Sequence, residues 1–208
     1  MNTLDRNRKY SREYVQDTKI GNIPNLIEKI IEKTEKIVDL GCGYGNLLRG
    51  IRKKYSKKNL AGIDISPKRV RFVKNKIPEG KIFCGDVCKT KLKNNSFDLV
   101  ISTQVIEHLE SDREIANEIF RITKKEGYVY VTSVIKKPWA IYKYRNKGKF
   151  VLDPTHEKEY KNEKEFLDLF KKKFKLIKFK VFPVRRKLLL LNIRIPGYYI
   201  VEGVWQKK

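Results

Sequence analysis

Short apolar runs alternate with lysine- and glutamate-rich segments along the chain up to residue 135. The runs are rich in β-branched residues and have the length of strands, at 36–40, 59–65, 81–85, 97–103 and 128–134. Strand–helix alternation of this kind requires right-handed crossover connections. We therefore predict an α/β fold with a doubly wound, mostly parallel sheet and helices on both faces.

Four helices are predicted among these strands, at about 23–31, 46–55, 67–76 and 111–123. The first rests on apolar residues at helical spacing, with Pro24 tolerated in its first turn. The third should begin with Ser66 as its N-cap. The fourth should begin at a capping box of Ser111 and Glu114, and Gly127 should end it.

The pattern changes after residue 135. Segment 136–160 is neither a clean helix nor a clean strand and combines two prolines with aromatic and histidine side chains, namely Trp139, Tyr142, Tyr144, Phe150, His156 and Tyr160. We interpret it as a lid or insertion, with an ordinary packed loop as the alternative. A helix at 162–172 and strands at 174–184 and 193–206 should follow, limited by Pro183 and by the turn signal Pro196–Gly197.

The length of 208 residues suits one domain, 1–208, with residues 1–22 as an N-terminal cap segment. The three cysteines, Cys42, Cys84 and Cys88, are odd in number and scattered, so no disulfide framework is expected and a reducing cytoplasm is the natural location. The N-terminus has no apolar leader, and the longest apolar run, 188–191, is far too short to span a bilayer.

Lysine and arginine number 48 against 24 acidic residues, which gives a formal net charge of +24. A positive net charge of this size attracts polyanions and would add a salt-dependent affinity for nucleic acid. The basic residues are spread along the chain, with local clusters at 53–58 and 171–175. A general lysine bias or a thermophile surface is the alternative explanation of the charge.

The strongest motif is IVDLGCGYGN at 37–46, which places Asp39 and three alternate glycines between a strand and a helix. Glycine allows a tight turn and lets a ligand approach the backbone closely. The N-terminus of the following helix offers unpaired N–H groups that suit a carboxylate. A dinucleotide-binding loop would need a third glycine where Asn46 stands, which disfavours an NAD-dependent enzyme.

Acidic residues follow the next two strands. Asp64 ends the second strand, where a carboxylate can accept hydrogen bonds from ribose hydroxyls, and Asp86 follows the third, where it can accept one from an adenine amino group. The segment 97–109 then begins with a fourth strand, which runs into the same edge of the sheet. Ligands of open α/β sheets bind at the carboxyl ends of the strands, so these residues should form one site. Without a ligand role, Asp64 would only cap the end of its strand and Asp86 would be an ordinary turn residue.

The glycine loop, together with the later Glu107-His108-Leu109 run, resembles the class I S-adenosylmethionine-dependent methyltransferases, in the branch with D-x-G-C-G-x-G and E-H-L motifs. The resemblance covers about residues 20–135 and extends weakly through 153–160. It implies a seven-stranded sheet with a final antiparallel strand and S-adenosyl-L-methionine as the cofactor. In some relatives aromatic residues cover the cofactor, and Tyr10 and Tyr14 resemble them.

The resemblance also implies roles for particular residues. The cofactor-binding residues it indicates are Asp39, Gly41, Cys42 and Gly43 for the methionine end, Asp64 and the adjoining Ile65 at the ribose, Asp86 and Val87 at the adenine, and Gln104 near the sulfonium. Some methyl acceptors need a base, and histidine titrates near neutral pH. We expect His156 to be that base, with a packed loop histidine as the alternative.

The acceptor is expected to be a small molecule, because the E-H-L branch is rich in such enzymes. RNA methylation and a non-catalytic, RNA-holding subunit are the alternatives. Methyltransferases that modify the terminal 2′-hydroxyl of small RNAs bind a metal through an E-x-x-E-H run and a distant histidine. Here Gln104 replaces the first acid before Glu107 and His108, so no metal is expected and these two residues could merely cap a local helix.

Overall fold

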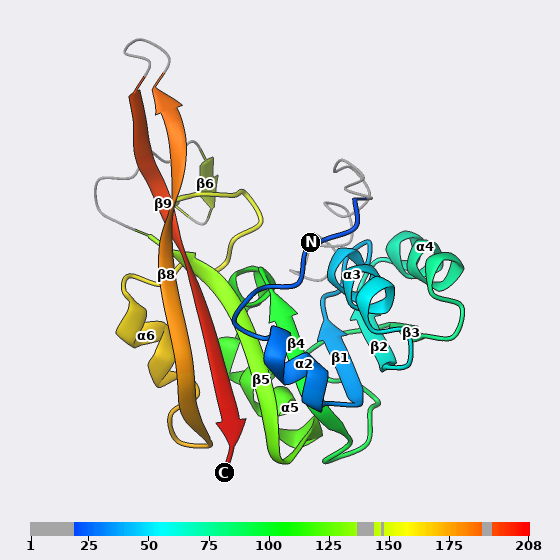
Figure 1. Ribbon diagram of the computed structural model, residues 1–208. Helices are drawn as coiled ribbons and strands as arrows, with labels where there is room; N and C mark the ends of the chain where they lie inside the picture. Colours follow the sequence, from blue (N-terminus) through cyan, green and yellow to red (C-terminus); the bar gives the residue numbers. More distant parts are fainter. Residues whose placement is uncertain (1–18, 137–143, 147, 189–192) are drawn as a thin grey trace.

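A computed structural model describes residues 19–136, 144–146, 148–188 and 193–208 of the chain. Its centre is a seven-stranded sheet in the order β3-β2-β1-β4-β5-β9-β8 (Figure 1). The strands are β1 (Lys36–Leu40), β2 (Asn59–Asp64), β3 (Lys81–Cys84), β4 (Phe97–Thr103), β5 (Thr123–Ile135), β8 (Phe174–Leu188) and β9 (Ile193–Lys207). Strands β1 to β5 pair in parallel, whereas β9 is antiparallel to both β5 and β8. The predicted seven-stranded sheet is confirmed.

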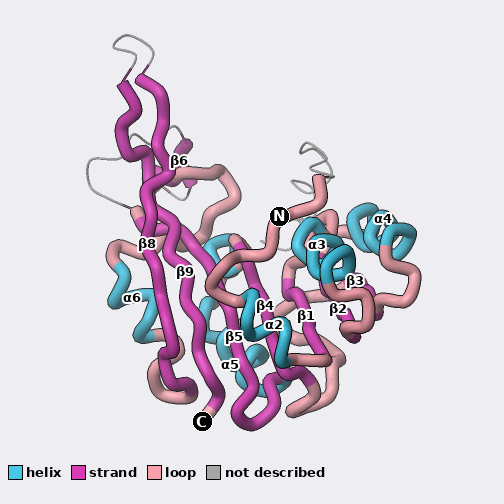
Figure 2. The backbone as a smooth tube through the Cα atoms, in the orientation of Figure 1, coloured by secondary structure: helices cyan, strands magenta, loops and turns pink. Residues whose placement is uncertain are grey.

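Helices cover both faces of this sheet (Figure 2). They are α2 (Glu28–Lys33), α3 (Asn46–Lys54), α4 (Pro67–Lys76), α5 (Asp112–Ile122) and α6 (Glu163–Asp168), with a short 3-10 helix η1 (Ile106–His108) after β4. Apolar residues of α2, α3 and α4 pack against one face in one buried cluster, and those of α5 and α6 pack in a second cluster. The sheet is therefore doubly wound, as its alternating sequence pattern predicts.

The second cluster contains a group of stacked aromatic rings beside the antiparallel end of the sheet. Phe166 of α6 is fully buried, and its ring centroid lies 5.7 Å from that of Trp205 on β9. The ring centroid of Phe170 lies 4.4 Å from the ring centroid of the same tryptophan. Large rings that bury most of their surface dominate core energetics, so this contact holds α6 and β9 together.

The first predicted helix is shorter than its apolar spacing indicates. Residues 25–27 form a turn in which the Ile27 amide donates to the Pro24 carbonyl, and α2 begins only at Glu28. The chain upstream is held against α3, because the Gly21 amide donates to the Asn46 carbonyl at 2.9 Å.

The end predicted for the fourth helix is wrong. Helix α5 ends at Ile122, and Gly127 lies inside β5. The last helical carbonyls are satisfied without a glycine, since the Ser96 amide donates to the Ile122 carbonyl and the Thr123 hydroxyl to that of Ile119. At the other end the Ser111 side chain accepts from the Glu114 amide, as predicted.

Ser66 occupies the N-cap position of α4, but its side chain makes no capping hydrogen bond. Its backbone amide instead donates to Asp64 at 2.9 Å. Helix α6 is also shorter than the predicted 162–172, because the chain continues from Leu169 to Lys173 as turns with i→i−3 hydrogen bonds.

The prolines of the C-terminal hairpin do not limit its strands as predicted. Pro183 lies within β8, opposite Tyr199 of β9, and Pro196 lies within β9. Strand β8 is at the edge of the sheet, where a missing N–H group can face outward. Strand β5 pairs with β9 only from Tyr199 onward, so Pro196 has a neighbour on one side alone. The hairpin consequently extends past the rest of the sheet (Figure 1).

The segment 136–160 is described in part. Two short strands, β6 (Tyr144–Asn146) and β7 (Lys149–Val151), form a separate hairpin, and the chain beyond them is partly buried at Thr155, His156 and Tyr160. Trp139 and Tyr142, like Tyr10 and Tyr14 near the N-terminus, lie outside the described residues. Among the described residues no helix is long and apolar enough to cross a membrane.

Candidate functional site

The glycine loop between β1 and α3 is shaped by backbone conformations that other residues rarely adopt. Gly41 has φ +80°, and a Cβ atom there would lie 2.3 Å from a methyl group of Val105. Gly43 has φ +55°, yet a Cβ atom there would meet nothing within 4 Å. The first glycine is required by packing, whereas the second leaves open space in which a ligand can approach the backbone.

A cavity of about 290 Å³ opens beside this loop at the carboxyl end of the parallel strands. The lining residues are Asp39, Cys42, Gly43, Tyr44, Asn46, Leu47, Arg69 and Thr103. Three residues predicted from the sequence, Asp39, Cys42 and Gly43, are among them. The position agrees with the rule that open α/β sheets bind ligands at their carboxyl edge.

Asp39 is the buried acid of this cavity. Its side chain is 2% exposed, and among the described residues Oδ1 has no hydrogen-bond partner. Burial, and then the nearby charge of Asp64, raise the pKa of Asp39 to about 7. A buried carboxyl group with an unused oxygen is a suitable partner for a cationic ligand group.

Asp64 lies behind the loop rather than in the cavity lining. One carboxylate oxygen accepts from the Gly43 amide at 2.8 Å, and the other accepts from the Ser66 amide at 2.9 Å. The Asp64 carboxylate therefore fixes the glycine loop against the end of β2. Each carboxylate oxygen can accept a further hydrogen bond, so these contacts leave capacity for ligand hydroxyls.

The remaining predicted cofactor residues lie near the same edge but outside the cavity lining. Asp86 accepts from the Cys88 amide at 2.8 Å in a local turn, and Val87 after it is buried. Ile65 follows β2 directly. Gln104 follows β4 with φ +54°, and its side-chain amide donates to Thr132 on β5 at 3.1 Å.

Arg69 is a cavity residue that the sequence analysis missed. It lies on α4, with its guanidinium 5.6 Å from the centroid of the Tyr44 ring and 3.9 Å from the Asp64 carboxylate. Tyr44, Asn46 and Leu47 were also missed and lie where the glycine loop meets α3, and the missed Thr103 lies at the end of β4. No local sequence signal singles out Arg69 among the several basic residues of α4.

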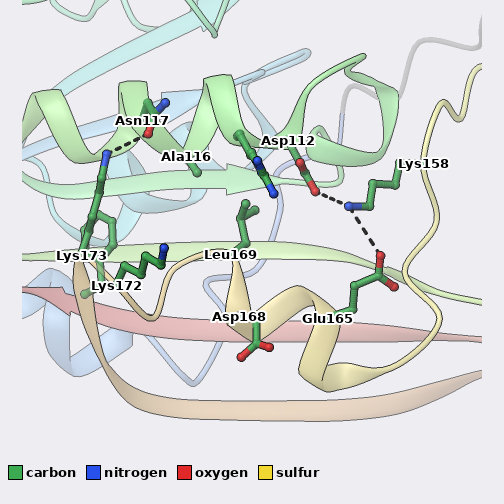
Figure 3. Close-up of a pocket in the computed structure, with 11 residues that line it drawn as sticks. Asp112, Ala116, Asn117, Lys158, Glu165, Asp168, Leu169, Lys172 and Lys173 are labelled. Atoms are coloured by element: carbon green, nitrogen blue, oxygen red, sulfur yellow. Dashed lines mark hydrogen bonds and ion pairs between the residues drawn. The ribbon is translucent and has the colours of Figure 1, made fainter.

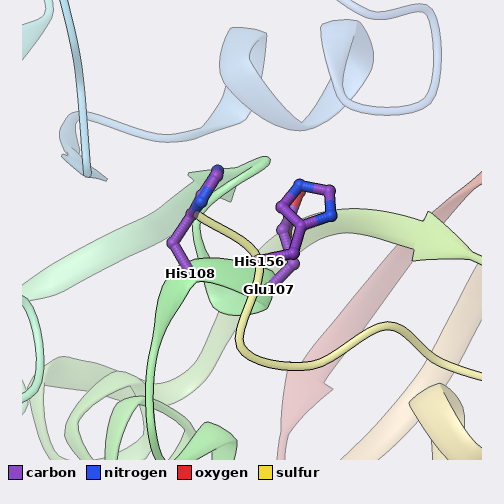
Figure 4. Close-up of side chains that lie close together, drawn as sticks. All are labelled: Glu107, His108 and His156. Carbon is purple, nitrogen blue, oxygen red and sulfur yellow. The ribbon is translucent and has the colours of Figure 1, made fainter. Parts of the chain in front are cut away.

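Glu107, His108 and His156 form a second group of side chains after the end of β4 (Figure 4). Their ligand-type atoms all lie within 4.8 Å of one another. Glu107 is 1% exposed, and burial raises its pKa to about 7. One of its oxygens accepts from the Ser133 hydroxyl at 3.0 Å, while among the described residues the other has no partner. We call these three residues the Glu–His–His cluster.

Backbone hydrogen bonds bring the distant histidine to this cluster. The carbonyl of Glu107 accepts from the amides of Glu157 and Lys158, at 2.8 and 3.1 Å. His156 is thereby placed beside η1, with its ring centroid 4.9 Å from that of His108. Burial, followed by the neighbouring His156, lowers the pKa of His108 to about 4, so this ring is neutral at physiological pH.

The Glu–His–His cluster adjoins the cavity. Thr103, at the end of β4, lines the cavity shortly before the chain enters η1. Arg69 lines it as well, and its charge contributes to the lowered pKa of His108. The cavity and the cluster therefore form two neighbouring halves of one region.

A larger hollow of about 560 Å³ lies between α5 and α6 (Figure 3). Several of its polar side chains bind one another. Lys158 forms ion pairs with Asp112 and Glu165, and Lys173 donates to Asn117. No predicted cofactor residue lines this hollow, so we assign it to the packing of the two helices.

Comparison with known proteins indicates a methyltransferase domain. Residues 38–131 match the family described as "Methyltransferase domain". An uncharacterized methyltransferase of Schizosaccharomyces pombe is 28% identical over 131 residues, covering 56% of this chain and 47% of that protein. The demethylmenaquinone methyltransferase of Thermotoga maritima is 23% identical over 111 residues, covering 53% and 48%. The chain thus matches about half the length of these relatives.

Solved structures show the same fold. A SAM-dependent methyltransferase from Methanosarcina mazei superposes with a TM-score of 0.69 at 17% identity, covering 89% of this chain and 98% of that one. The cavity fits the cofactor of this family, since the unused Asp39 oxygen suits an ammonium group and Gly43 leaves space for its approach. Residues 38–131 therefore carry a methyltransferase domain, and these relatives and solved structures support membership of the class I S-adenosylmethionine-dependent methyltransferases, whose cofactor is S-adenosylmethionine.

Proposed function

We propose that the protein transfers the methyl group of S-adenosylmethionine to a small-molecule acceptor whose reacting oxygen or nitrogen lies at the Glu–His–His cluster. The observation that carries this proposal is the adjacency of the two halves of the site: Thr103 lines the cavity, and Val105, which packs against Gly41 of the glycine loop, lies two residues before Glu107. The first half would hold the cofactor and the second would receive the acceptor. The proposal treats 1–208 as one methyltransferase domain.

The roles proposed for the cofactor-binding residues rest on their positions in the fold. Asp39 would bind the ammonium group of the methionine end, and the loop amides from Gly41 to Gly43 its carboxylate. Asp64 and Ile65 would lie at the ribose, where the carboxylate has accepting capacity left. The adenine would lie by Asp86 and Val87, and Gln104 near the sulfonium.

The bound cofactor supplies a methyl group that is already activated for in-line displacement. The chain's contribution is to align the acceptor with that methyl group and to exclude water. Segment 136–160 is proposed as the cover, because its described part packs on η1 through the Glu107 carbonyl. Lids of this kind often limit turnover.

Acceptor activation is proposed at His156. The ring is 7% exposed, and its Nδ1 atom lies 2.7 Å from the Glu159 carboxylate, which fixes its orientation. A histidine so placed can lower the cost of removing a proton from an acceptor hydroxyl. Its neighbour Glu107 is buried as well, and His108 is half-buried.

A ring-bearing acceptor is favoured among small molecules. The demethylmenaquinone methyltransferase of Thermotoga maritima is named for a small-molecule acceptor. The aromatic side chains of segment 136–160 suit an apolar ring.

The three cysteines are unpaired, which supports the reducing cytoplasm expected for such an enzyme.

RNA is the second candidate acceptor, favoured by the net charge of +24. A cationic surface of this size attracts any polyanion and does not by itself specify chemistry. A non-catalytic subunit that binds the cofactor and holds RNA is the related alternative. It would bind the cofactor and transfer no methyl group to any acceptor.

A transfer screen with methyl-labelled cofactor tests the proposal. The protein is incubated with separate pools of hydroxylated ring compounds, tRNA and proteins, and incorporated label is counted. We expect label in the small-molecule pool, strongly reduced for Asp39→Asn and unchanged for Glu114→Gln, an exposed acid on α5. Label in tRNA alone would establish the second candidate, and label in no pool despite cofactor binding would support the non-catalytic subunit.

A further inference from the structure

We propose that Glu107, His108 and His156 form a binding site for one divalent transition-metal ion on the acceptor side of the cofactor cavity. The inference deepens the proposed function, on which it rests for the identity of the acceptor side. It revises the expectation of no metal, which depended on Gln104 standing where an acid would be needed. The geometry provides three other ligands without Gln104.

The ligand set selects the class of ion. One carboxylate and two imidazoles suit Zn²⁺, Fe²⁺, Co²⁺, Mn²⁺ or Ni²⁺, whereas Mg²⁺ and Ca²⁺ prefer sites made of oxygen atoms. Three protein ligands also leave coordination positions open for an atom of another molecule. The side chain of Gln104 takes no part, because it donates to Thr132.

The carboxylate of Glu107 carries the strongest indication. The residue is 1% exposed, and the Ser133 hydroxyl satisfies only one of its two oxygens. Among the described residues the second oxygen, Oε1, has no hydrogen-bond partner. A carboxylate buried in this way is costly unless a cation or a donor compensates it. A metal ion between Glu107 and the two rings would supply that compensation.

Hydrogen bonds also orient the two rings for metal binding. The Thr155 hydroxyl donates to Asp153 at 2.6 Å, so it can only accept from His108, whose Nδ1 atom lies 2.9 Å away. The proton of His108 is then on Nδ1, and Nε2 carries the lone pair. Such outer hydrogen bonds fix the tautomer of metal-binding histidines.

His156 follows the same arrangement. Its Nδ1 atom lies 2.7 Å from the Glu159 carboxylate, which also accepts from the Leu152 amide at 2.6 Å. A carboxylate paired with Nδ1 leaves Nε2 as the coordinating nitrogen of His156, in the carboxylate–histidine–metal order common in metal sites.

The separation of the ligand atoms is close to that of a metal site. Ligands bonded at about 2.1 Å lie about 3 to 4.2 Å apart around one ion. The corresponding atoms here lie within 4.8 Å of one another (Figure 4). The largest separation would therefore have to shorten by roughly 0.6 to 1.8 Å to close the site. Backbone bonds from Glu157 and Lys158 to the Glu107 carbonyl already hold the two segments together.

Metal-ion binding to the full-length protein tests the inference directly. The protein is treated with EDTA, dialysed, and titrated separately with Co²⁺, Zn²⁺, Mn²⁺ and Mg²⁺, with calorimetry and elemental analysis as readouts. We expect one ion of Co²⁺ or Zn²⁺ per chain, visible absorption bands from bound Co²⁺, and no comparable binding of Mg²⁺. No retained ion from any of the transition metals would overturn the inference.

Three variants and a control locate the site. Glu107→Gln and His156→Asn should each weaken Co²⁺ binding by more than about 100-fold, and Thr155→Val, which keeps all three ligands, by roughly 10- to 100-fold. The exposed acid substituted in Glu114→Gln should leave binding unchanged. Circular dichroism checks folding, and Thr155→Val decides the matter if a ligand variant fails to fold. One ion bound equally by all variants would place the metal elsewhere.

These measurements need neither cofactor nor acceptor, so they separate the two proposals. A chain that binds Co²⁺ at the cluster but methylates nothing contradicts the proposed function and keeps the metal site. A chain that methylates an acceptor after EDTA treatment, with no metal retained, contradicts the metal site and keeps the function. In the metal-bound form His156 acts on the acceptor through the ion rather than by taking a proton itself.

Discussion

Thr155 and His108 are 47 residues apart in the sequence, yet the threonine hydroxyl lies 2.9 Å from Nδ1 of the histidine. This contact joins the segment after β7 to the short helix η1 at the end of β4. The region beside the cofactor cavity is thus built from two distant parts of the chain. If the proposed function is correct, residues after β5, and not only the glycine loop, contribute to the acceptor side of the site.

The buried acid Asp39 should make stability depend on pH. In the fold it keeps its proton up to about pH 7, whereas in the unfolded chain it loses it near pH 4. Between these values the folded state binds more protons, so the free energy of unfolding should fall as pH rises. The share due to Asp39 is on the order of 2–4 kcal/mol.

Urea unfolding at pH 4.5 to 8, where the free energy of unfolding is measured at about six values of pH, checks this prediction. Asp39→Asn should flatten the profile in part, because Glu107, whose pKa burial also raises to about 7, contributes a slope of the same sign. A profile of unchanged slope in the variant would show that Asp39 does not hold its proton in the fold.

The stacked rings at the antiparallel end of the sheet should contribute strongly to stability. Phe166→Ala removes a fully buried ring that contacts Trp205, and we expect a loss of about 3–5 kcal/mol in the free energy of unfolding. Phe182→Ala is the matched control, because that ring on β8 is 37% exposed. Chemical denaturation measures both variants, and equal losses would contradict the assignment of Phe166 to the core.

His156→Ala should reduce methyl transfer about 10- to 1,000-fold, the range for losing a positioned base or orienting group. Cofactor affinity should barely change, since the ring lies outside the cavity lining. Steady-state kinetics with an acceptor from the screen, together with calorimetry of cofactor binding, gives both quantities. Wild-type kinetics in the variant would make His156 a packing residue.

The basic surface makes a prediction about RNA. If the net charge of +24 serves RNA, the affinity for tRNA should fall steeply between about 50 and 200 mM salt, because bound counterions are released. Filter binding at several salt concentrations measures this slope, and the bound tRNA should also accept a methyl group. Salt-sensitive binding without methylation would leave the charge as a general property of the surface.

The fold around the glycine loop could be predicted because its signals are local. A strand, a glycine loop and a helix follow one another in sequence, and β1 and β4 have the predicted bounds. Asp64 was found because it ends a strand, and the parallel sheet carries every such end to one edge. These features need no knowledge of distant contacts.

Other features depend on contacts between distant parts of the chain, which no local sequence pattern specifies. His156 comes to Glu107 only through backbone bonds from the residues that follow it. Arg69 enters the cavity because α4 packs beside the glycine loop, and a lysine-rich helix gives no sign of which basic residue will do so. Pro183 falls inside a strand because β8 is an edge strand, and edge position is a property of the whole sheet.

Calorimetric titration with S-adenosylmethionine and its demethylated product tests the central claim most directly. The wild-type chain should bind each at one site with a dissociation constant in the micromolar range and should not bind NAD. Asp64→Ala should weaken binding by about 1.5–3 kcal/mol, the scale of a lost charge-assisted hydrogen bond, while Asp168→Asn, an exposed acid on α6, should not. Tight binding of NAD with no heat from either methionine compound would contradict the account.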